Sequence, residues 1–294
     1  MIRSSFKNDS GEEFSFISAS PLETSAPSLI FFHATGFNGQ TYWQLIKELE
    51  GKHQNKINFI SFDQRGHGHS TATAKPEELN TWSPYLQDAL DFVDSLEGPI
   101  FCSGHSMGAI VAAKVASLRK DKVRKLIMLE PVLYSPYESF KYSVKRKLGF
   151  NRNVELVALA SKRRRHFESQ EEMINSYYGR GIFSTWEKPW IQDYVEGGTK
   201  KIAGEKVELT CAPEWESRTF QTTDMNSWPY LRKLDIPVYV MCGDINSTFT
   251  PKARKAAKKL GKNWQFEVFP EASHSLPMEL GQDLIDRIHQ FMSK

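Results

Sequence analysis

Short apolar runs bounded by turn residues alternate along the chain with longer stretches of helical periodicity. This alternation is typical of a parallel sheet with helices on both of its faces. Residues 12–17 alternate phenylalanine with polar residues, which predicts a solvated edge strand, antiparallel to its neighbour. We expect core strands at residues 28–32, 57–62, 99–103, 125–129, 236–242 and 265–269, and helices at 83–96, 106–119 and 276–291.

The alternation is interrupted between residues 134 and 225, where no strand-like run is found. This stretch is too long for a loop, so it predicts a mainly helical insertion that covers one end of the sheet as a cap or lid. The core is then made of residues 1–133 and 226–294. We expect the aromatic residues of the insertion to form the interior of the cap: Phe140, Tyr177, Tyr178, Phe183, Trp186, Trp190 and Trp215.

The composition is that of an ordinary globular protein, with 294 residues, 40% hydrophobic and 25% charged. A net charge of +3 is too small to indicate a nucleic-acid partner. The basic run from Lys162 to His166 is interpreted as a solvated helix face. No apolar run approaches the ~20 residues of a membrane span, and the first residues lack a secretory signal, so we expect a cytoplasmic location.

The cysteines, Cys102, Cys211 and Cys242, are odd in number and have no paired metal-ligand spacing. Two of them lie inside apolar, strand-like runs. We interpret all three as buried, reduced thiols. Neither a metal nor a cofactor is expected.

The strongest chemical signal is the pentapeptide Gly104-His105-Ser106-Met107-Gly108, which follows an apolar strand and opens an apolar helix. A strand, a sharp turn and a helix are the context in which the G-x-S-x-G pattern indicates a nucleophilic serine. The two glycines have a steric reason, because side chains at their positions would collide across the turn. We therefore predict Ser106 as the nucleophile, above the carboxyl ends of the strands, where open α/β sheets bind ligands.

A nucleophilic serine needs a general base within hydrogen-bond reach. His274 lies in a polar loop between the last strand and the last helix, the setting expected of the base in the order Ser, acid, His. His67 and His69 lie in a glycine-rich turn that we interpret as structural, braced by Asp63 and Arg65. No further ligands cluster with these two histidines, so a metal site is not predicted.

Four features together resemble the α/β-hydrolase superfamily, and in particular its capped esterases. They are the pentapeptide around Ser106, the late His274, and the runs Asp63-Gln64-Arg65-Gly66-His67-Gly68 and His33-Ala34-Thr35-Gly36-Phe37. The resemblance covers residues 28–119 and 236–294. It implies the α/β-hydrolase fold, with a mostly parallel eight-stranded sheet, helices on both faces and a helical cap, together with a catalytic triad and an oxyanion hole. It does not imply a substrate.

The triad acid departs from the pattern of that superfamily. Most relatives carry an Asp in a Gly-x-x-Asp turn after the strand expected at 236–242, but this turn reads Gly243-Asp244-Ile245-Asn246. An amide cannot stabilise an imidazolium by charge, and the corresponding Asp-to-Asn change costs a serine protease about 10⁴ in kcat.

Two acidic residues could replace the missing Asp. Glu130 ends the strand expected at 125–129, and its longer side chain can reach the same histidine from a neighbouring strand tip, where some branches of the superfamily carry the acid. Asp244 lies two positions early in the turn. We favour Glu130, with Asp244 as the alternative and the absence of any acid as the third possibility.

Acyl transfer also requires hydrogen-bond donors where negative charge develops. This fold draws one donor from the amide after the nucleophile, here Met107, and one from the loop after an early strand. Aligning Gly36-Phe37 with the usual His-Gly-x loop selects Phe37 as the second donor, whereas a count from His33 selects Thr35. We favour Phe37.

The sequence thus predicts a serine hydrolase that forms an acyl-enzyme on Ser106, with carboxylic esters as the default substrate class. We expect a small ester with an apolar acyl or alcohol part. Hydrolysis of carbon–carbon, thioester, lactone or amide bonds would use the same triad and stays open. So does a non-catalytic binding protein that keeps the fold, because Asn246 replaces the usual acid. The sequence does not determine the oligomeric state, and a homodimer stays open.

Overall fold

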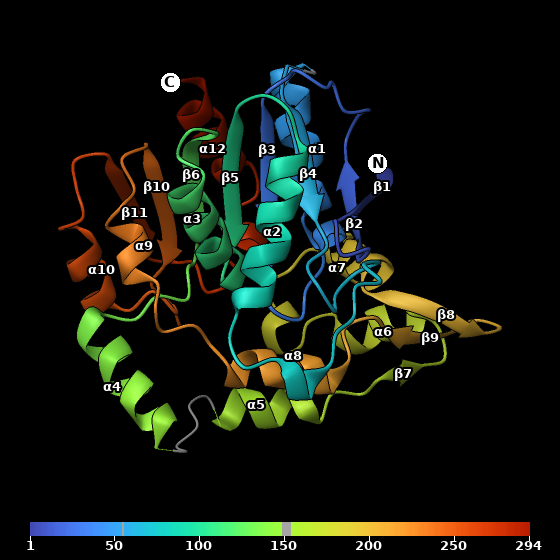
Figure 1. The fold of residues 1–294 in the computed structure, drawn as a ribbon. Helices are drawn as coiled ribbons and strands as arrows, with labels where there is room; N and C mark the ends of the chain where they lie inside the picture. The colour runs from blue at the N-terminus through green and yellow to red at the C-terminus, as the bar shows by residue number, and fades with distance from the viewer. Residues whose placement is uncertain (55, 149–153) are drawn as a thin grey trace.

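The main sheet of the protein has eight strands in the order β1-β2-β4-β3-β5-β6-β10-β11 (Figure 1). The computed structural model describes residues 1–54, 56–148 and 154–294. β2 pairs antiparallel with both β1 and β4, and the other neighbours are parallel. This is the mostly parallel eight-stranded sheet that was predicted. Its strands are β1 (Ile2–Lys7), β2 (Glu13–Ser18), β3 (Ser28–Phe32), β4 (Asn58–Phe62), β5 (Ile100–His105), β6 (Val123–Leu129), β10 (Val238–Gly243) and β11 (Trp264–Phe269).

Helices cover both faces of this sheet (Figure 1). α1 and α12 contribute buried apolar residues to the core on one face, and α2, α3, α9 and α10 contribute to the core on the other. β3, β4 and β10 are buried along their whole length, which is why such strands read as continuous apolar runs. The helices of the core are η1 (Gly39–Tyr42), α1 (Trp43–His53), η2 (Pro76–Glu78), α2 (Ser83–Ser95), α3 (Met107–Leu118), α9 (Trp228–Leu231), α10 (Pro251–Ala257), α11 (Leu276–Glu279) and α12 (Gln282–Ser293).

The chain between β6 and α9 forms a separate group of elements, called here the β6–α9 connection, which lies at the lower end of the main sheet in Figure 1. Its three strands form a small antiparallel sheet in the order β7-β9-β8. α7 holds it to the core, because the Asn38 side chain donates to the Tyr194 carbonyl (3.0 Å) and Gln44 donates to Asp193 (2.6 Å). The elements are α4 (Pro136–Lys147), α5 (Val154–Ser161), β7 (His166–Phe167), α6 (Gln170–Tyr177), η3 (Gly181–Phe183), α7 (Lys188–Gly197), β8 (Thr199–Ala203), β9 (Lys206–Leu209) and α8 (Pro213–Gln221).

Several strands differ from the sequence-based expectation. β2 is antiparallel as predicted, but it is not a solvated edge: β1 lies outside it, and five of its six residues are buried. β1 was not predicted, because an outermost strand keeps many polar, partly exposed residues. The strands of the small sheet were missed for the same reason, since only the first residue of β8 is buried. The helix predicted at 276–291 is two helices, α11 and α12, separated at Gly281.

The aromatic residues of the β6–α9 connection follow the expectation only in part. Phe183, Trp186, Trp190 and Trp215 are buried and Tyr177 is half-buried, whereas Phe140 and Tyr178 are exposed. The expectation that all seven form the interior of the cap is therefore wrong for Phe140 and Tyr178.

The cysteines are free and buried, as predicted: Cys102, Cys211 and Cys242. No helix within the described ranges is both long and apolar enough to cross a membrane. Over the same residues, no group of three or more His, Cys, Asp or Glu side chains is arranged to hold a metal ion.

Phe62 provides a test of the aromatic core. Its ring is fully buried and lies 4.6 Å from Phe92, 5.5 Å from Phe14 and 6.0 Å from Phe32, centroid to centroid. Phe62→Ala should lower the free energy of unfolding by about 3–5 kcal/mol, because it removes this buried surface and leaves a cavity. Phe140→Ala is the control and should change it by less than about 0.5 kcal/mol. Equal losses in urea unfolding would contradict this description of the core.

Candidate active site

Ser106 occupies the sharp turn between β5 and α3, with φ 57° and ψ −115°. This is a strained conformation for a residue other than glycine. Its amide donates to the Leu129 carbonyl (3.0 Å). A Cβ on Gly104 would lie 2.4 Å from the Gly108 backbone, and one on Gly108 would lie 2.0 Å from the Phe32 carbonyl oxygen. The two glycines therefore allow the strand and the helix to meet as closely as this turn requires.

His274 lies in the loop after β11 and faces the serine. Its Nε2 is 3.0 Å from Ser106 Oγ, and its Nδ1 is 3.2 Å from Glu130 Oε2. Thr248 Oγ1 is also 3.2 Å from Nδ1. The structure thus brings together the three residues that the sequence analysis favoured as nucleophile, base and acid.

Glu130 follows β6 and is completely buried. Its Oε1 accepts hydrogen bonds from the Gly243 amide (2.5 Å) and the Ser247 hydroxyl (2.9 Å), and its Oε2 accepts one from the Thr248 amide (3.2 Å). Donors of this kind offset the cost of burying a carboxyl group. Gly243 ends β10, and Ser247 and Thr248 follow in the turn that carries Asn246.

The other residues of that turn have different surroundings. The Asp244 side chain is 57% exposed and forms an ion pair with Arg254 (2.8 Å). Asn246 is exposed and has φ 51°, a left-handed conformation that asparagine tolerates well. Within the described chain, neither residue contacts His274.

The loop between β3 and η1, residues 33–38, is called here the early loop. Its two candidate oxyanion donors are distinguished by their hydrogen bonds. The Phe37 amide donates to the Ala34 carbonyl (3.1 Å), which closes a turn and points this N–H into the loop. The amide of Phe37, the donor favoured from the sequence, is therefore already engaged in a hydrogen bond. The Thr35 amide has no acceptor among the residues that the structure describes, as expected of a donor that awaits a ligand. Met107 is the first residue of α3, where amides have no partner within the helix.

Two buried, neutral histidines hold the early loop. His67 Nε2 accepts from the Gly36 amide (3.1 Å), so its Nδ1 carries the proton and donates to the Arg65 carbonyl (2.9 Å). His33 Nε2 accepts from the Gln64 amide (3.0 Å). Burial lowers the pKa of His67 to about 3 and that of His33 to about 4. The Asp63 carboxylate ties the start of η1 to the loop after β4, because it accepts hydrogen bonds from the Gly39 and His69 amides, at 2.7 and 3.0 Å.

A hydrogen-bonded chain that the sequence analysis missed connects the early loop to the base. The Ala34 amide donates to the Tyr42 hydroxyl (3.2 Å), and this hydroxyl donates to His105 Nδ1 (2.7 Å). His105 Nε2 then donates to the His274 carbonyl (2.8 Å). Burial, followed by the proximity of His274, holds the pKa of His105 well below its ordinary value. The position of His105 inside the pentapeptide was a signal for this role, but Tyr42 gave none.

The β6–α9 connection also touches the early loop. Arg163, part of the basic run, follows α5 and is half-buried, with its side chain 19% exposed. It pairs with Glu216 of α8 and donates to the Tyr194 hydroxyl (2.6 Å). The Tyr194 hydroxyl in turn lies 3.4 Å from the Gly36 carbonyl. A Cβ on Gly36, which has φ 75°, would lie 2.4 Å from Glu216 Oε1. The prediction of a solvated helix face is therefore wrong for Arg163.

An aromatic wall lies beside these polar groups. The Phe37 ring is 5.3 Å from Trp186, 5.6 Å from Tyr194 and 6.0 Å from His105, centroid to centroid. Trp186 is buried, and its indole nitrogen has no partner among the described residues. The surroundings of the site are apolar on this side.

A serine at a strand–helix turn of a mostly parallel sheet, faced by a histidine from a late loop, is the arrangement of α/β hydrolases. The sequence matches the model of the alpha/beta hydrolase family over residues 29–287. The chain therefore belongs to the α/β-hydrolase family.

Individual relatives match shorter parts of the chain. (E)-2-((N-methylformamido)methylene)succinate hydrolase of Acinetobacter baylyi is 31% identical over 105 residues, 35% of this chain and 37% of that protein. Protein phosphatase methylesterase 1 of Debaryomyces hansenii is 27% identical over 133 residues, 42% of this chain and 34% of that protein. The chain thus spans little more than a third of these relatives' length. The solved structure of E-2-(acetamidomethylene)succinate hydrolase is similar over 100% of both chains, with a TM-score of 0.77 and 21% identity, and this supports the fold.

The low pKa of His67 predicts a pH dependence of stability. The unfolded chain restores an ordinary pKa near 6.5, so between about pH 3 and pH 6.5 it binds a proton that the folded protein does not. Stability should fall as the pH falls through this range. His67→Gln keeps an acceptor for the Gly36 amide and removes this titration. Between pH 7 and pH 5, the wild type should lose about 2 kcal/mol more unfolding free energy than the variant.

The matched control for this measurement is His166→Gln, because His166 is exposed. This variant should follow the wild type in urea unfolding at both pH values. Identical pH dependence of the wild type and His67→Gln would show that His67 does not titrate as described.

Proposed function

We propose that this protein is a serine hydrolase that cleaves carboxylic esters through an acyl-enzyme on Ser106. The observation that carries the proposal is the continuous hydrogen-bonded chain from Ser106 Oγ through His274 to the buried Glu130 carboxylate. In this chain Ser106 is the nucleophile, His274 the general base and Glu130 the acid that orients the imidazole.

In the first half of the reaction, Ser106 Oγ attacks the ester carbonyl carbon while His274 Nε2 takes the hydroxyl proton. The negative charge on the carbonyl oxygen is stabilised by the amides of Met107 and Thr35. The tetrahedral intermediate collapses as the bond to the alcohol oxygen breaks, and His274 gives its proton to that oxygen. In the second half, His274 takes a proton from water as the hydroxide attacks the acyl carbon. The bond between this carbon and Ser106 Oγ then breaks, and His274 returns its proton to Oγ, which releases the carboxylic acid and free Ser106.

Glu130 acts in both halves by stabilising the imidazolium that forms each time. Its hydrogen bonds with the turn after β10 fix its position, so it can orient His274 with Nε2 towards the serine. Thr248 adds a contact with the same His274 nitrogen. We infer that the position of the acid has moved from the turn after β10 to the end of β6.

The substrate class rests on the surroundings of the site. The wall of Phe37, Trp186 and Tyr194 favours an apolar acyl or alcohol part, with the β6–α9 connection as the cap that encloses it. Similarity to a methylesterase supports an ester bond. Thioester, lactone, amide and carbon–carbon bonds would use the same groups and are distinguished by a substrate panel. Three buried free thiols support a cytoplasmic location.

The nucleophile can be tested by activity and by covalent labelling. The wild type should hydrolyse short and medium p-nitrophenyl esters, and a fluorophosphonate probe should label Ser106 stoichiometrically. Ser106→Ala should abolish the labelling and reduce kcat by several orders of magnitude, because the acyl-enzyme can no longer form. In the labelled protein, the phosphonyl oxygen should lie within about 3.1 Å of the Met107 and Thr35 amides.

Ser103→Ala is the matched control, because Ser103 is a buried serine of β5, three residues before Ser106. It should keep both activity and labelling. A wild-type protein that neither turns over these esters nor reacts with the probe would favour the non-catalytic binding protein instead.

The acid is tested by comparing Glu130→Gln with Asp244→Asn. Glu130→Gln should lower kcat by about 10⁴ with little change in KM, as the loss of the charge on the triad acid does in serine proteases. Asp244→Asn removes only an exposed ion pair and should change kcat less than about threefold. Thermal unfolding of both variants separates loss of folding from loss of activity. Small and equal effects on kcat would rule out Glu130 as the acid.

A further inference from the structure

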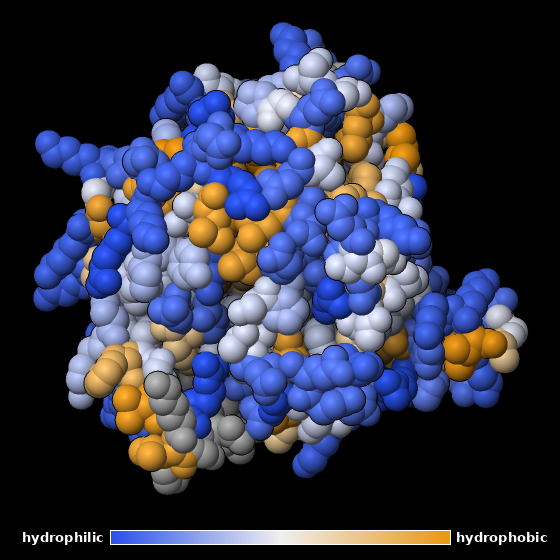
Figure 2. Space-filling model, in the orientation of Figure 1, coloured by the Kyte–Doolittle hydropathy of each residue, from blue (hydrophilic) through white to orange (hydrophobic). Residues whose placement is uncertain are grey.

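α4 presents an apolar face to the solvent. Tyr137, Phe140 and Val144 are 73%, 69% and 40% exposed, and their spacing of three and four residues places them on one side of the helix. Leu148, which follows the helix, continues the same side and is 69% exposed. Figure 2 shows orange residues gathered at the lower left, where Figure 1 places α4.

The opposite side of α4 is polar and faces the protein. Ser139 is buried, the Tyr142 ring packs 6.0 Å from Tyr134, and the Arg146 guanidinium donates to the Thr223 carbonyl (3.2 Å). The amphipathic helix is thus turned with its apolar side outward, the reverse of an ordinary surface helix. Exposed apolar faces of this kind mark interaction surfaces.

Basic residues flank the apolar face. α4 contains four basic residues and one acidic residue, and the acidic one, Glu138, is engaged in the capping box with Ser135 at the start of the helix. Lys141 and Lys145 are exposed next to Phe140 and Val144. An exposed apolar stripe with basic flanks is the pattern of helices that lie in the interface of an anionic membrane.

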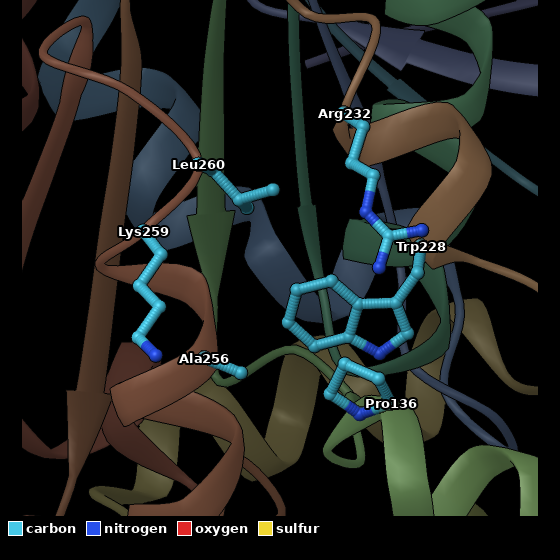
Figure 3. Close-up of a pocket in the computed structure, with 6 residues that line it drawn as sticks. All are labelled: Pro136, Trp228, Arg232, Ala256, Lys259 and Leu260. Atoms are coloured by element: carbon cyan, nitrogen blue, oxygen red, sulfur yellow. The ribbon is translucent and has the colours of Figure 1, made fainter.

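A hollow of about 390 Å³ adjoins the start of α4 (Figure 3). Its floor includes the buried Trp228, and Arg232 and Lys259 stand on opposite sides of it. Both cations are exposed, and neither has a carboxylate partner within the described chain. The hollow is lined by Pro136, Trp228, Arg232, Ala256, Lys259 and Leu260.

We propose that the apolar face of α4 and this hollow form one docking surface for an anionic lipid bilayer. The side chains of Phe140 and Val144 enter the acyl region, and Tyr137 lies at the level of the head groups. Lys141, Lys145 and the two cations of the hollow contact lipid phosphates. Charge complementarity favours a lipid surface over an apolar protein partner, because the cations lie on both sides of the apolar stripe.

The docking surface lies at the catalytic end of the sheet. α4 begins shortly after Glu130, so a bilayer in contact with α4 also lies beside the end of the sheet that carries Ser106. Docking would therefore bring the site close to molecules dissolved in the bilayer. This consequence rests on the proposed function, whereas docking itself does not depend on catalysis.

The test is flotation of the full-length protein with vesicles of phosphatidylcholine, with and without phosphatidylglycerol. The wild type should float with the anionic vesicles, remain mostly unbound with the neutral ones, and be released by high salt. Phe140→Ser/Val144→Ser should weaken binding about tenfold by removing the apolar contact. Lys141→Glu/Lys145→Glu and Arg232→Glu/Lys259→Glu should each weaken it about tenfold by reversing two charges.

Lys201→Glu/Ile202→Ser is the matched control, since it changes an exposed cation and an exposed apolar residue on β8. It should bind like the wild type. The proposal is overturned if the wild type does not float with anionic vesicles, or if the α4 variants float as well as the control. It is also overturned if the wild type is a dimer that Phe140→Ser/Val144→Ser dissociates, because the face would then pack against a second copy of the chain.

Discussion

The carboxylate of Glu130 lies where no water reaches it, and a charge in that position must be surrounded by donors. Those donors come from the turn after β10 and from His274, so this one group joins the ends of two strands and the loop after a third. If the turn moved, the carboxylate would lose its hydrogen bonds, and the histidine would lose its orientation. The geometry of the site therefore depends on satisfying a single buried charge.

The early loop is held instead by hydrogen bonds of uncharged histidine rings. His67 and His33 each accept a backbone amide and donate to a backbone carbonyl, which only the uncharged ring can do. The β6–α9 connection presses on the same loop, since Glu216 leaves no room for a side chain at Gly36. The early loop, which carries the Thr35 amide, is thus held from two sides, by the core and by the connection. If Thr35 is the oxyanion donor that we propose, it requires no rearrangement during the reaction.

The sequence predicts the parts of this protein that depend on burial and on spacing. The central strands appear as apolar runs, and the position of Glu130 beside His274 follows from the fact that neighbouring parallel strands end side by side. The direction of a backbone amide cannot be predicted from spacing, so the hydrogen bond between the Phe37 amide and the Ala34 carbonyl was not expected. β1 and the small sheet were missed because exposed strands lack the apolar pattern on which the prediction depends. The partial burial of Arg163 follows from its partners, Glu216 and Tyr194, which are distant in sequence.

Asn246 shows why a missing residue need not mean a missing function. Its backbone has φ 51°, a conformation that favours asparagine over most residues, and the turn it helps to form directs the Gly243 and Thr248 amides at Glu130. An acidic residue at position 246 would place a second carboxyl group on the turn that surrounds Glu130, and nearby like charges disfavour each other. If Glu130 is the triad acid, as we propose, the amide at position 246 is compatible with it, and the departure from the family pattern follows from the position of Glu130.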